Sequence, residues 1–570
     1  MSRSTAFLRN VPVLAGLDDA SLDRLAGEVR GIHVRAGDWI MRQGDAAKSL
    51  FIVRTGRIEV VDEGPPETLI RVLRRGDVLG ELALLRQGTR SASARARRDA
   101  ELLELGRDAF EALIQEAPSF ALGLTRAMGA QLAASRTPIA SATPPRTIGV
   151  VGLDQAAPVA EVADAMVAAL AEHGSVCGLR SGELWAIDQA EQDNDRVVLA
   201  GGADPEDAWT NVCLREADLV LAVGTGPPAA AWMRRATALG GCELVIIGRR
   251  VAADTVAALR PREVQVLTEP DRLGDALAAT ARRLAGCSVG IVLSGGGARA
   301  LAHLGVLEEL SAAGVRFDRI AGVSLGSLVA AAAAAGFTLD GMREAFEQAF
   351  VHSNPTNDFV PPAFSLVRGA KTRHLLSDNF GDRRIEELPL RFFCLSCDLV
   401  AREAVLHRTG PVADAVYPSL AIPGVFPPVA TDDGRLLVDG AVLDNLPVAT
   451  MARAGEGPVI AVDVTGRMGQ FRRRQSAAVA RLGRPVRRLL TGSDAEVPRL
   501  SETLVRTVTV GSIDTVAAAR MHADLVITPP AEGIALMDWK ALPRVRELGR
   551  QAARDALASD PDVAERLGLG

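Results

Sequence analysis

The sequence predicts a multidomain protein with three folded parts: an N-terminal β-roll, a middle parallel α/β sheet, and a C-terminal α/β/α domain. Short β-type runs separated by glycine turns fill the first part, and strand-like and helix-like runs alternate in the second. In the third, buried strands run into glycine-containing turns and then into apolar helices. A chain of 570 residues exceeds the size at which one hydrophobic core stops growing, which agrees with several domains. We expect the parts at residues 11–135, 147–287 and 288–570, with a linker at 136–146.

Composition and charge narrow the classes of function. The net charge is −6, whereas nucleic-acid-binding domains carry a basic excess, so no nucleic-acid partner is expected. Six cysteines in so long a chain do not indicate a disulfide framework, and Cys394 and Cys397 have no second pair with which to bind zinc, so no metal site is expected. Residues 1–13 lack the apolar core of a signal peptide, and no run reaches the roughly 20 apolar residues of a membrane-spanning helix. We therefore expect a cytoplasmic protein, either free or peripheral on the inner membrane face.

The first part has the pattern of a small β-roll with one distinctive turn. Glycine turns recur about every ten to twenty residues between strand-like runs. Gly80-Glu81-Leu82 then opens a short apolar helical turn, and Arg90-Ser91-Ala92 follows it. Free amides at a helix start, a permanent guanidinium, and a carboxylate that accepts from a sugar hydroxyl suit a ribose cyclic phosphate.

This segment resembles the cyclic-nucleotide-binding family, whose phosphate-binding cassette reads Gly-Glu, an apolar turn, then Arg-Ser/Thr-Ala. The resemblance implies that Glu81 holds the ribose 2′-hydroxyl. It also implies that Arg90, Ser91 and the amides near Gly80 and Leu82 hold the phosphate of cyclic AMP or cyclic GMP. A domain that keeps the fold without the ligand stays open as the alternative.

The middle part predicts a parallel sheet, because strands and helices alternate. Strands are expected at 147–152, 197–201, 218–224, 243–248 and 264–267, with helices at 158–172 and 227–239. No Gly-x-x-x-x-Gly-Lys-Ser/Thr sequence is present, so nucleotide hydrolysis is not expected here. The segment Trp209 to Asp218 resembles the region ahead of the catalytic domain in bacterial relatives of neuropathy target esterase. We interpret the middle part as a structural coupler.

Two glycine motifs follow successive strands in the third part. The first strand runs into Ser294-Gly295-Gly296-Gly297-Ala298-Arg299-Ala300. This turn also fits a dinucleotide fingerprint, but that motif expects an acidic residue at the end of the second strand, and Asp318 precedes the strand. The second strand ends in Gly322-Val323-Ser324-Leu325-Gly326 before an Ala-rich helix, which is the context of a nucleophile elbow. Gly322 and Gly326 permit the tight turn that exposes the serine.

A serine nucleophile needs a base. None of the histidines after the elbow stands in a setting that indicates a catalytic partner, whereas Asp439-Gly440-Ala441 follows an apolar run at an expected strand end. A carboxylate in a partly dry pocket can serve as general base. We predict Ser324 as nucleophile and Asp439 as base, with the amides of the turn Gly295 to Gly297 receiving the oxyanion.

These features resemble the patatin-like phospholipase family over about residues 288–464. The glycine-rich turn, the Gly-x-Ser-x-Gly elbow and the Asp-Gly-Ala motif occur in the family's order, and residues 418–428 match its Ser- and Pro-rich block. Ala300 stands where the family usually has glycine, and Ser294 replaces a further glycine of many members. The resemblance implies a serine acyl hydrolase for (lyso)phospholipid esters that needs no cofactor.

Several points stay open from sequence. A general carboxylesterase or thioesterase, or a cyclic-nucleotide-responsive protein with a vestigial hydrolase, are the alternatives. Residues 467–490 carry many arginines and no acidic residue, which predicts either a peripheral membrane contact or a loop whose charge reflects composition. The sequence indicates no oligomeric state.

Overall fold

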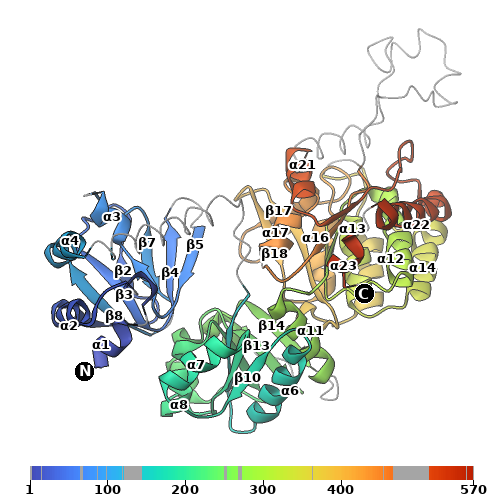
Figure 1. Cartoon of the computed structure of the whole chain (residues 1–570). Helices are drawn as coiled ribbons and strands as arrows, with labels where there is room; N and C mark the ends of the chain where they lie inside the picture. The colour runs from blue at the N-terminus through green and yellow to red at the C-terminus, as the bar shows by residue number, and fades with distance from the viewer. Residues whose placement is uncertain are drawn as a thin grey trace, which may run out of the picture. The chain divides into compact units, whose positions relative to one another are not determined.

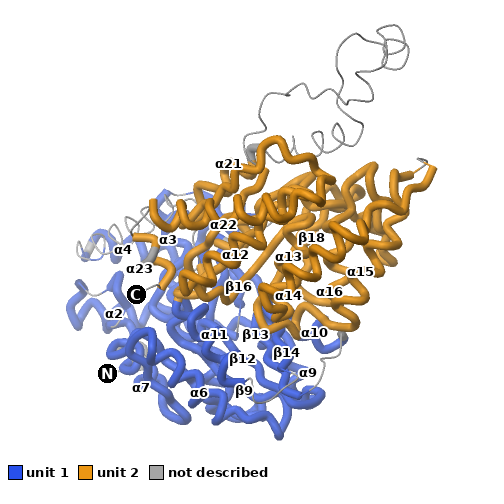
Figure 2. Tube along the Cα trace, turned by 90° about the vertical axis from the view of Figure 1, so that its right-hand side faces the viewer, with its two compact units in different colours: residues 1–285 blue, residues 286–570 orange. Residues whose placement is uncertain are grey.

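The computed structural model divides into two compact units, Met1–Ala285 and Gly286–Gly570 (Figure 2). It describes all residues except 1, 2, 10, 15, 64–67, 87, 98, 118, 119, 121–143, 249–252, 268–272, 362, 363, 454, 466–512, 560, 561, 569 and 570. Among the helices formed by the described residues, none combines the length and apolar character needed to cross a bilayer.

The first unit begins with the predicted β-roll (Figure 1). Its strands form two antiparallel sheets, ordered β1-β8-β3-β6 and β2-β7-β4-β5. The strands are β1 Arg30–Val34, β2 Trp39–Met41, β3 Ser49–Thr55, β4 Ile58–Asp62, β5 Thr68–Leu73, β6 Val78–Leu79, β7 Ser93–Ala96 and β8 Ala100–Gly106. The helices are α1 Arg3–Leu8, α2 Asp19–Glu28, α3 Glu81–Leu85 and α4 Arg107–Glu116. Gly37 and Gly76 have φ of 90° and 84°, a backbone conformation that glycine adopts without strain, which explains why glycines mark these turns.

The rest of the first unit is a parallel six-stranded sheet in the order β10-β11-β9-β12-β13-β14. Its strands are β9 Thr147–Gly152, β10 Val176–Leu179, β11 Arg196–Ala200, β12 Leu219–Gly224, β13 Glu243–Ile247 and β14 Glu263–Leu267. The helices are α6 Val159–Ala171, α7 Leu184–Asp193, α8 Ala208–Glu216, α9 Ala230–Arg234, α10 Ala253–Leu259 and α11 Leu273–Ala285. β9, β12 and β13 are buried along their whole length, as expected of central strands covered on both faces.

A buried arginine joins the β-roll to this sheet. The Arg57 guanidinium donates through Nε to Asp218 Oδ1 at 2.9 Å and also donates to the carbonyl of Glu216. The other oxygen of Asp218 accepts from the backbone amides of Arg146 and Thr147, where β9 begins. Asp218 ends the segment Trp209 to Asp218, and it contacts both parts of the unit.

The second unit contains a mixed sheet in the order β19-β20-β17-β16-β15-β21-β22, with β18 paired to β17. The strands are β15 Gly290–Leu293, β16 Arg319–Gly322, β17 Arg391–Asp398, β18 Glu403–His407, β19 Val429–Ala430, β20 Leu436–Asp439, β21 Val459–Val462 and β22 Leu525–Ile527. The helices are α12 Ala302–Ala312, α13 Leu325–Ala334, α14 Leu339–Phe346, α15 Ala370–Phe380, α16 Val412–Leu420, α17 Val448–Ala452, α21 Ile513–Met521, α22 Leu542–Ser559 and α23 Asp562–Arg566. A π-helical turn, Glu347–Ser353, follows α14.

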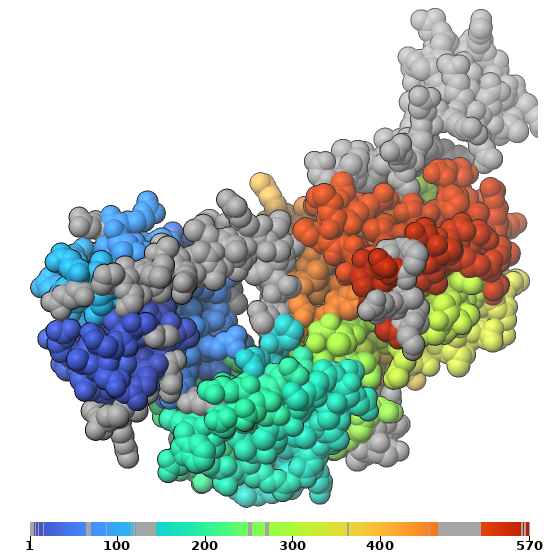
Figure 3. Space-filling model, viewed as in Figure 1, coloured from blue at the N-terminus to red at the C-terminus, as the bar shows by residue number. Residues whose placement is uncertain are grey.

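The long helix α22 packs closely on α12, next to the glycine-rich turn. A methyl group on Gly305 would collide with the carbonyl of Arg546, and one on Gly549 would collide with the carbonyl of Ala302, so both glycines allow the two helices to approach. Arg546 forms an ion pair with Glu308 at 2.8 Å. Figure 3 shows the C-terminal segment, coloured red, on the surface of the second unit.

Candidate active site

The sheet brings the two glycine motifs and Asp439 to one edge. β15 and β16 are parallel neighbours, so the turn after Leu293 and the elbow after Gly322 lie side by side. β17 extends beyond β16, because Gly322 pairs with Cys394 while the strand continues to Asp398. Asp439, at the end of the antiparallel strand β20, pairs with Ser396 in this extension. Asp439 therefore lies level with the elbow.

Ser324 has a strained backbone at the start of an apolar helix. Its φ and ψ are 53° and −134°, and α13 begins at the next residue. The turn needs glycine on both sides, because a methyl group on Gly322 would collide with the carbonyl of Gly326, and one on Gly326 would lie 2.5 Å from the carbonyls of Leu293 and Ser294. A strained backbone conformation persists only where contacts with the surrounding structure enforce it, and such residues are concentrated at functional sites.

The Asp439 carboxyl is buried and contacts the serine. The residue is 1% exposed, and one of its oxygens accepts from the amide of Ala441 at 2.9 Å. Burial raises the pKa of Asp439 to about 7, against the lowering effect of hydrogen bonds from the Ser324 hydroxyl and the Ala441 amide. A carboxyl that titrates near neutral pH beside a serine hydroxyl has the properties of a general base.

The glycine turn faces this pair, and its amides differ in their bonding. The Gly295 amide donates to Asn445 Oδ1 at 3.1 Å, so this amide is already engaged. In the part of the chain that the structure describes, no acceptor is found for the amides of Gly296 and Gly297. Gly297 has φ of 54°, and a methyl group there would collide with the carbonyl of Leu536. The turn thus offers two open donors next to the serine.

His303 contacts the residue that precedes the glycine turn. Its Nε2 lies 2.8 Å from the Ser294 carbonyl, and burial lowers the pKa of His303 to about 4. The imidazole is therefore neutral at physiological pH, and Nε2 donates to the carbonyl. The Ser294 hydroxyl accepts from the amide of Val464 at 3.0 Å, and Ala300 is fully buried in the core. A hydrogen bond therefore accommodates the Ser294 side chain, and packing in the core accommodates the Ala300 methyl group.

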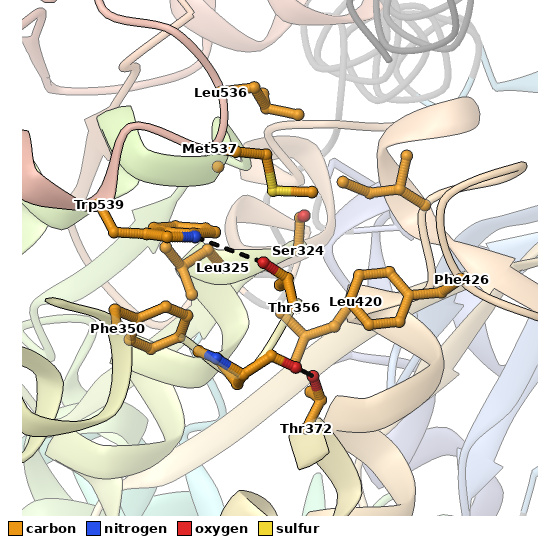
Figure 4. A pocket seen from close by; sticks show the side chains of 13 residues that line it. Ser324, Leu325, Phe350, Thr356, Thr372, Leu420, Phe426, Leu536, Met537 and Trp539 are labelled. Carbon is orange, nitrogen blue, oxygen red and sulfur yellow. Dashed lines mark hydrogen bonds between the residues drawn. The ribbon is translucent and has the colours of Figure 1, made fainter. Parts of the chain in front are cut away.

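An apolar cavity opens onto Ser324 (Figure 4). Its volume is about 430 Å³, including space open to solvent. The lining is Gly297, Ser324, Leu325, Phe350, Pro355, Thr356, Thr372, Leu420, Ile422, Phe426, Leu536, Met537 and Trp539.

A second apolar cavity of about 340 Å³ shares one residue, Phe350, with the first. Its other lining residues come mainly from α13, α14 and α15 and include Phe337, Phe346 and Phe380. The Phe350 ring contacts two other aromatic rings, with its centroid 5.7 Å from that of Phe346 and 4.8 Å from that of Trp539. Both cavities are suited to hydrocarbon rather than to a charged group.

The nucleotide cassette also folds together in the first unit. Gly80 has φ of 88° and precedes α3, and a methyl group on it would collide with the Arg90 guanidinium. Arg90 is 5% exposed and donates to the carbonyls of Gly80 at 3.0 Å and Ser49 at 2.7 Å. The buried Glu81 lies 4.0 Å from Arg71, while Leu82 and Ser91 are exposed.

Some residues of the site were not predicted from sequence. Asn445 binds the Gly295 peptide through Oδ1, and Ser419 accepts the Ser324 amide at 3.0 Å. Asn445 follows the Asp-Gly-Ala motif closely and Ser419 lies in the Ser- and Pro-rich block, but neither position shows on its own which backbone it contacts. The cavity wall at 536–539 comes from the C-terminal segment and has no sequence signal. The basic segment 467–490 lies outside the described residues.

Two parts of the chain match known protein families. Residues 291–452 match the patatin-like phospholipases, and residues 32–117 match the cyclic nucleotide-binding domain. By fold and by sequence, the chain is a patatin-like hydrolase with an N-terminal cyclic nucleotide-binding domain.

Similar proteins extend the relationship to the whole chain. An NTE family protein of Mycobacterium tuberculosis is 34% identical over 98% of this chain and 97% of its own length. The chain belongs to the NTE family. Lysophospholipase nte1 of Aspergillus fumigatus is 25% identical over 91% of this chain and 41% of its own length. The regulatory domain of Toxoplasma gondii PKA, solved with cAMP, is 30% identical over 19% of this chain and 42% of that chain, at a TM-score of 0.19.

Proposed function

We propose that the chain hydrolyses the carboxylic ester of lysophospholipids through a dyad of Ser324 and Asp439. The observation that carries this proposal is the contact between a strained serine and a buried carboxyl whose pKa is raised to about 7, at an apolar cavity. The fungal relative named as a lysophospholipase supports the substrate class.

The first half of the reaction forms an acyl-enzyme. Ser324 Oγ attacks the ester carbonyl while its proton passes to the Asp439 carboxylate. The carbonyl oxygen becomes an oxyanion and accepts from the amides of Gly296 and Gly297, for which one donor is typically worth roughly 2.7–4 kcal/mol of barrier. The tetrahedral intermediate collapses as the C–O bond breaks, and Asp439 returns the proton to the departing glycerol oxygen.

The second half releases the fatty acid. Water attacks the acyl carbon and gives its proton to Asp439, and the same two amides hold the new oxyanion. The bond to Ser324 Oγ then breaks, and the proton returns to the serine. No metal or other cofactor enters these steps.

A general carboxylesterase or thioesterase is the alternative within hydrolases. A lysophospholipid carries one acyl chain and forms micelles, so an enzyme built for it should work faster on the aggregated substrate. The rate of fatty-acid release from lysophosphatidylcholine, measured below and above its critical micelle concentration, tests this. A rise above that concentration supports the lipid substrate, whereas equal rates, with faster cleavage of a soluble thioester, support the alternative.

We infer that the cassette binds a cyclic nucleotide and that occupancy changes the hydrolysis rate. Support comes from the clustering of Gly80, Glu81 and Arg90, and from the Arg57–Asp218 contact between the β-roll and the parallel sheet. Regulation requires the nucleotide to bind active and inactive arrangements with different affinity. Titration of the wild type and Arg90→Leu with cyclic AMP and cyclic GMP tests binding, and the hydrolysis rate at saturation tests coupling. An unchanged rate at full occupancy contradicts regulation.

A further inference from the structure

A loop beside the cavity exposes two phenylalanines. Residues 354–369 connect the π-helical turn to α15. On this loop Phe359 is 75% exposed and Phe364 is 88% exposed. Among the aromatic side chains that the structure describes, Trp185 at 68% is the other one that is largely exposed. A single exposed apolar side chain is ordinary, but two phenylalanines close together on one loop are not.

Backbone contacts join the described residues on the two sides of 362–363. Phe359 pairs with Val367 in an isolated β-bridge, and the amide of Val360 donates to the carbonyl of Leu366 at 3.1 Å. The amide of Arg368 donates to the carbonyl of Asp358 at 2.9 Å. Val367 is buried, so the loop turns an aliphatic side chain inward and leaves the larger aromatic ones outside.

The same loop forms part of the cavity wall. Pro355 and Thr356 at its beginning line the cavity that contains Ser324. At its other end the amides of Leu366 and Val367 donate to the carbonyls of Gly424 and Val425 at 3.0 Å each. These two carbonyls lie between Ile422 and Phe426 in sequence, which also line the cavity. The exposed rings are therefore fixed at the border of the catalytic cavity.

Charge next to the loop indicates the kind of surface that it meets. Arg368, Lys371 and Arg373 are exposed at its end and in the first turn of α15, whereas Asp358 is the one carboxylate between 354 and 373. Aromatic side chains that enter the acyl boundary, flanked by cations that attract anionic head groups, are the arrangement of interfacial membrane binding.

We propose that Phe359 and Phe364 insert into a lipid surface and place the mouth of the Ser324 cavity at that surface. The occupant of this patch is a membrane or micelle, from which a single-chain lipid passes along the loop into the apolar cavity. The delivery of a lipid substrate to Ser324 rests on the proposed lipid hydrolysis, whereas the binding of the loop to a lipid surface does not require turnover.

Vesicle binding tests the proposal independently of catalysis. The full chain in a Ser324→Ala background is floated with phosphatidylcholine vesicles, with and without added phosphatidylglycerol. Phe359→Ser with Phe364→Ser is expected to weaken binding about 100-fold, about tenfold for each ring removed from the apolar boundary. Trp185→Ser, which removes a largely exposed aromatic side chain of the first unit, serves as the control and should bind like the parent.

Equal vesicle binding by the double variant and the parent would overturn the proposal, and so would the absence of vesicle binding by the parent. Specific capture of a protein by the patch without vesicle binding would overturn it as well. In the catalytically intact chain, the ratio of hydrolysis on vesicles to hydrolysis of a dispersed short-chain ester should fall in the double variant. If vesicle binding follows the prediction but no ester is cleaved, the proposed function fails and the docking surface stands.

Discussion

The backbone amide of Ser324 donates to the hydroxyl of Ser419 at 3.0 Å, across 95 residues of sequence. Ser419 is fully buried in α16, and this contact holds the peptide of the residue with the strained φ. The Ser- and Pro-rich block therefore helps to fix the conformation of the elbow.

Ser419→Ala is expected to lower kcat at least tenfold with little change in KM. The variant leaves a buried amide without its acceptor, which typically costs about 1–3 kcal/mol and allows the elbow to relax away from Asp439. Steady-state kinetics on a dispersed ester checks this, with Ser377→Ala, an exposed serine on α15, as control. An unchanged kcat in a folded Ser419→Ala chain would show that the elbow keeps its shape without this bond.

The rate should depend on pH through Asp439. Burial raises the pKa of this carboxyl to about 7, so the carboxyl is increasingly protonated below that pH and cannot accept the serine proton. We expect kcat/KM to rise about tenfold per pH unit below 7 and to level off above it. A profile that stays flat between pH 5 and pH 9 would exclude Asp439 as the base.

Asp439→Asn should gain stability while it loses activity. Because the folded pKa lies above the unfolded value, the wild type loses stability as pH rises from about 4 to about 7, by at most about 4 kcal/mol. The neutral amide does not titrate, so its advantage over the wild type should grow by about 2.5 kcal/mol between pH 5 and pH 8. Urea unfolding at both pH values measures this, with the exposed Asp432→Asn as control. An advantage that does not change with pH would contradict the raised pKa.

Phe350→Leu should shift the preference toward longer acyl chains. Phe350 lines both apolar cavities, so a smaller side chain at this position should widen the connection between them. We expect the ratio of kcat/KM for long over medium chains to rise about fivefold, since each methylene accommodated is worth roughly 1 kcal/mol or more. Phe346→Leu enlarges the second cavity alone and should leave the ratio unchanged. An equal shift in both variants would mean that Phe350 is not the boundary.

The larger part of the fold could be predicted from short stretches of sequence, because the spacing of apolar residues and the positions of glycines can be read within each stretch. Ser324 comes after the buried strand β16 and Asp439 ends the strand β20, and the structure brings both to one sheet edge. The edge strand β10 was missed because Val176–Leu179 is short and half-buried, so its pattern is weak. Ser419 and Asn445 act through hydrogen bonds to residues 95 and 150 positions away in the sequence, and only the tertiary fold reveals such pairs. The domain boundaries stay a prediction, since the β-roll and the parallel sheet form one compact unit here.

Fatty-acid release from lysophosphatidylcholine is the most direct test of the Ser324–Asp439 dyad. Wild type, Ser324→Ala and Asp439→Asn are compared with the exposed-site controls Ser377→Ala and Asp432→Asn. We predict turnover by the wild type and both controls, and at least a thousandfold loss in each dyad variant while it stays folded. Full activity of either dyad variant, or a wild type that releases no fatty acid, would contradict hydrolysis by this dyad.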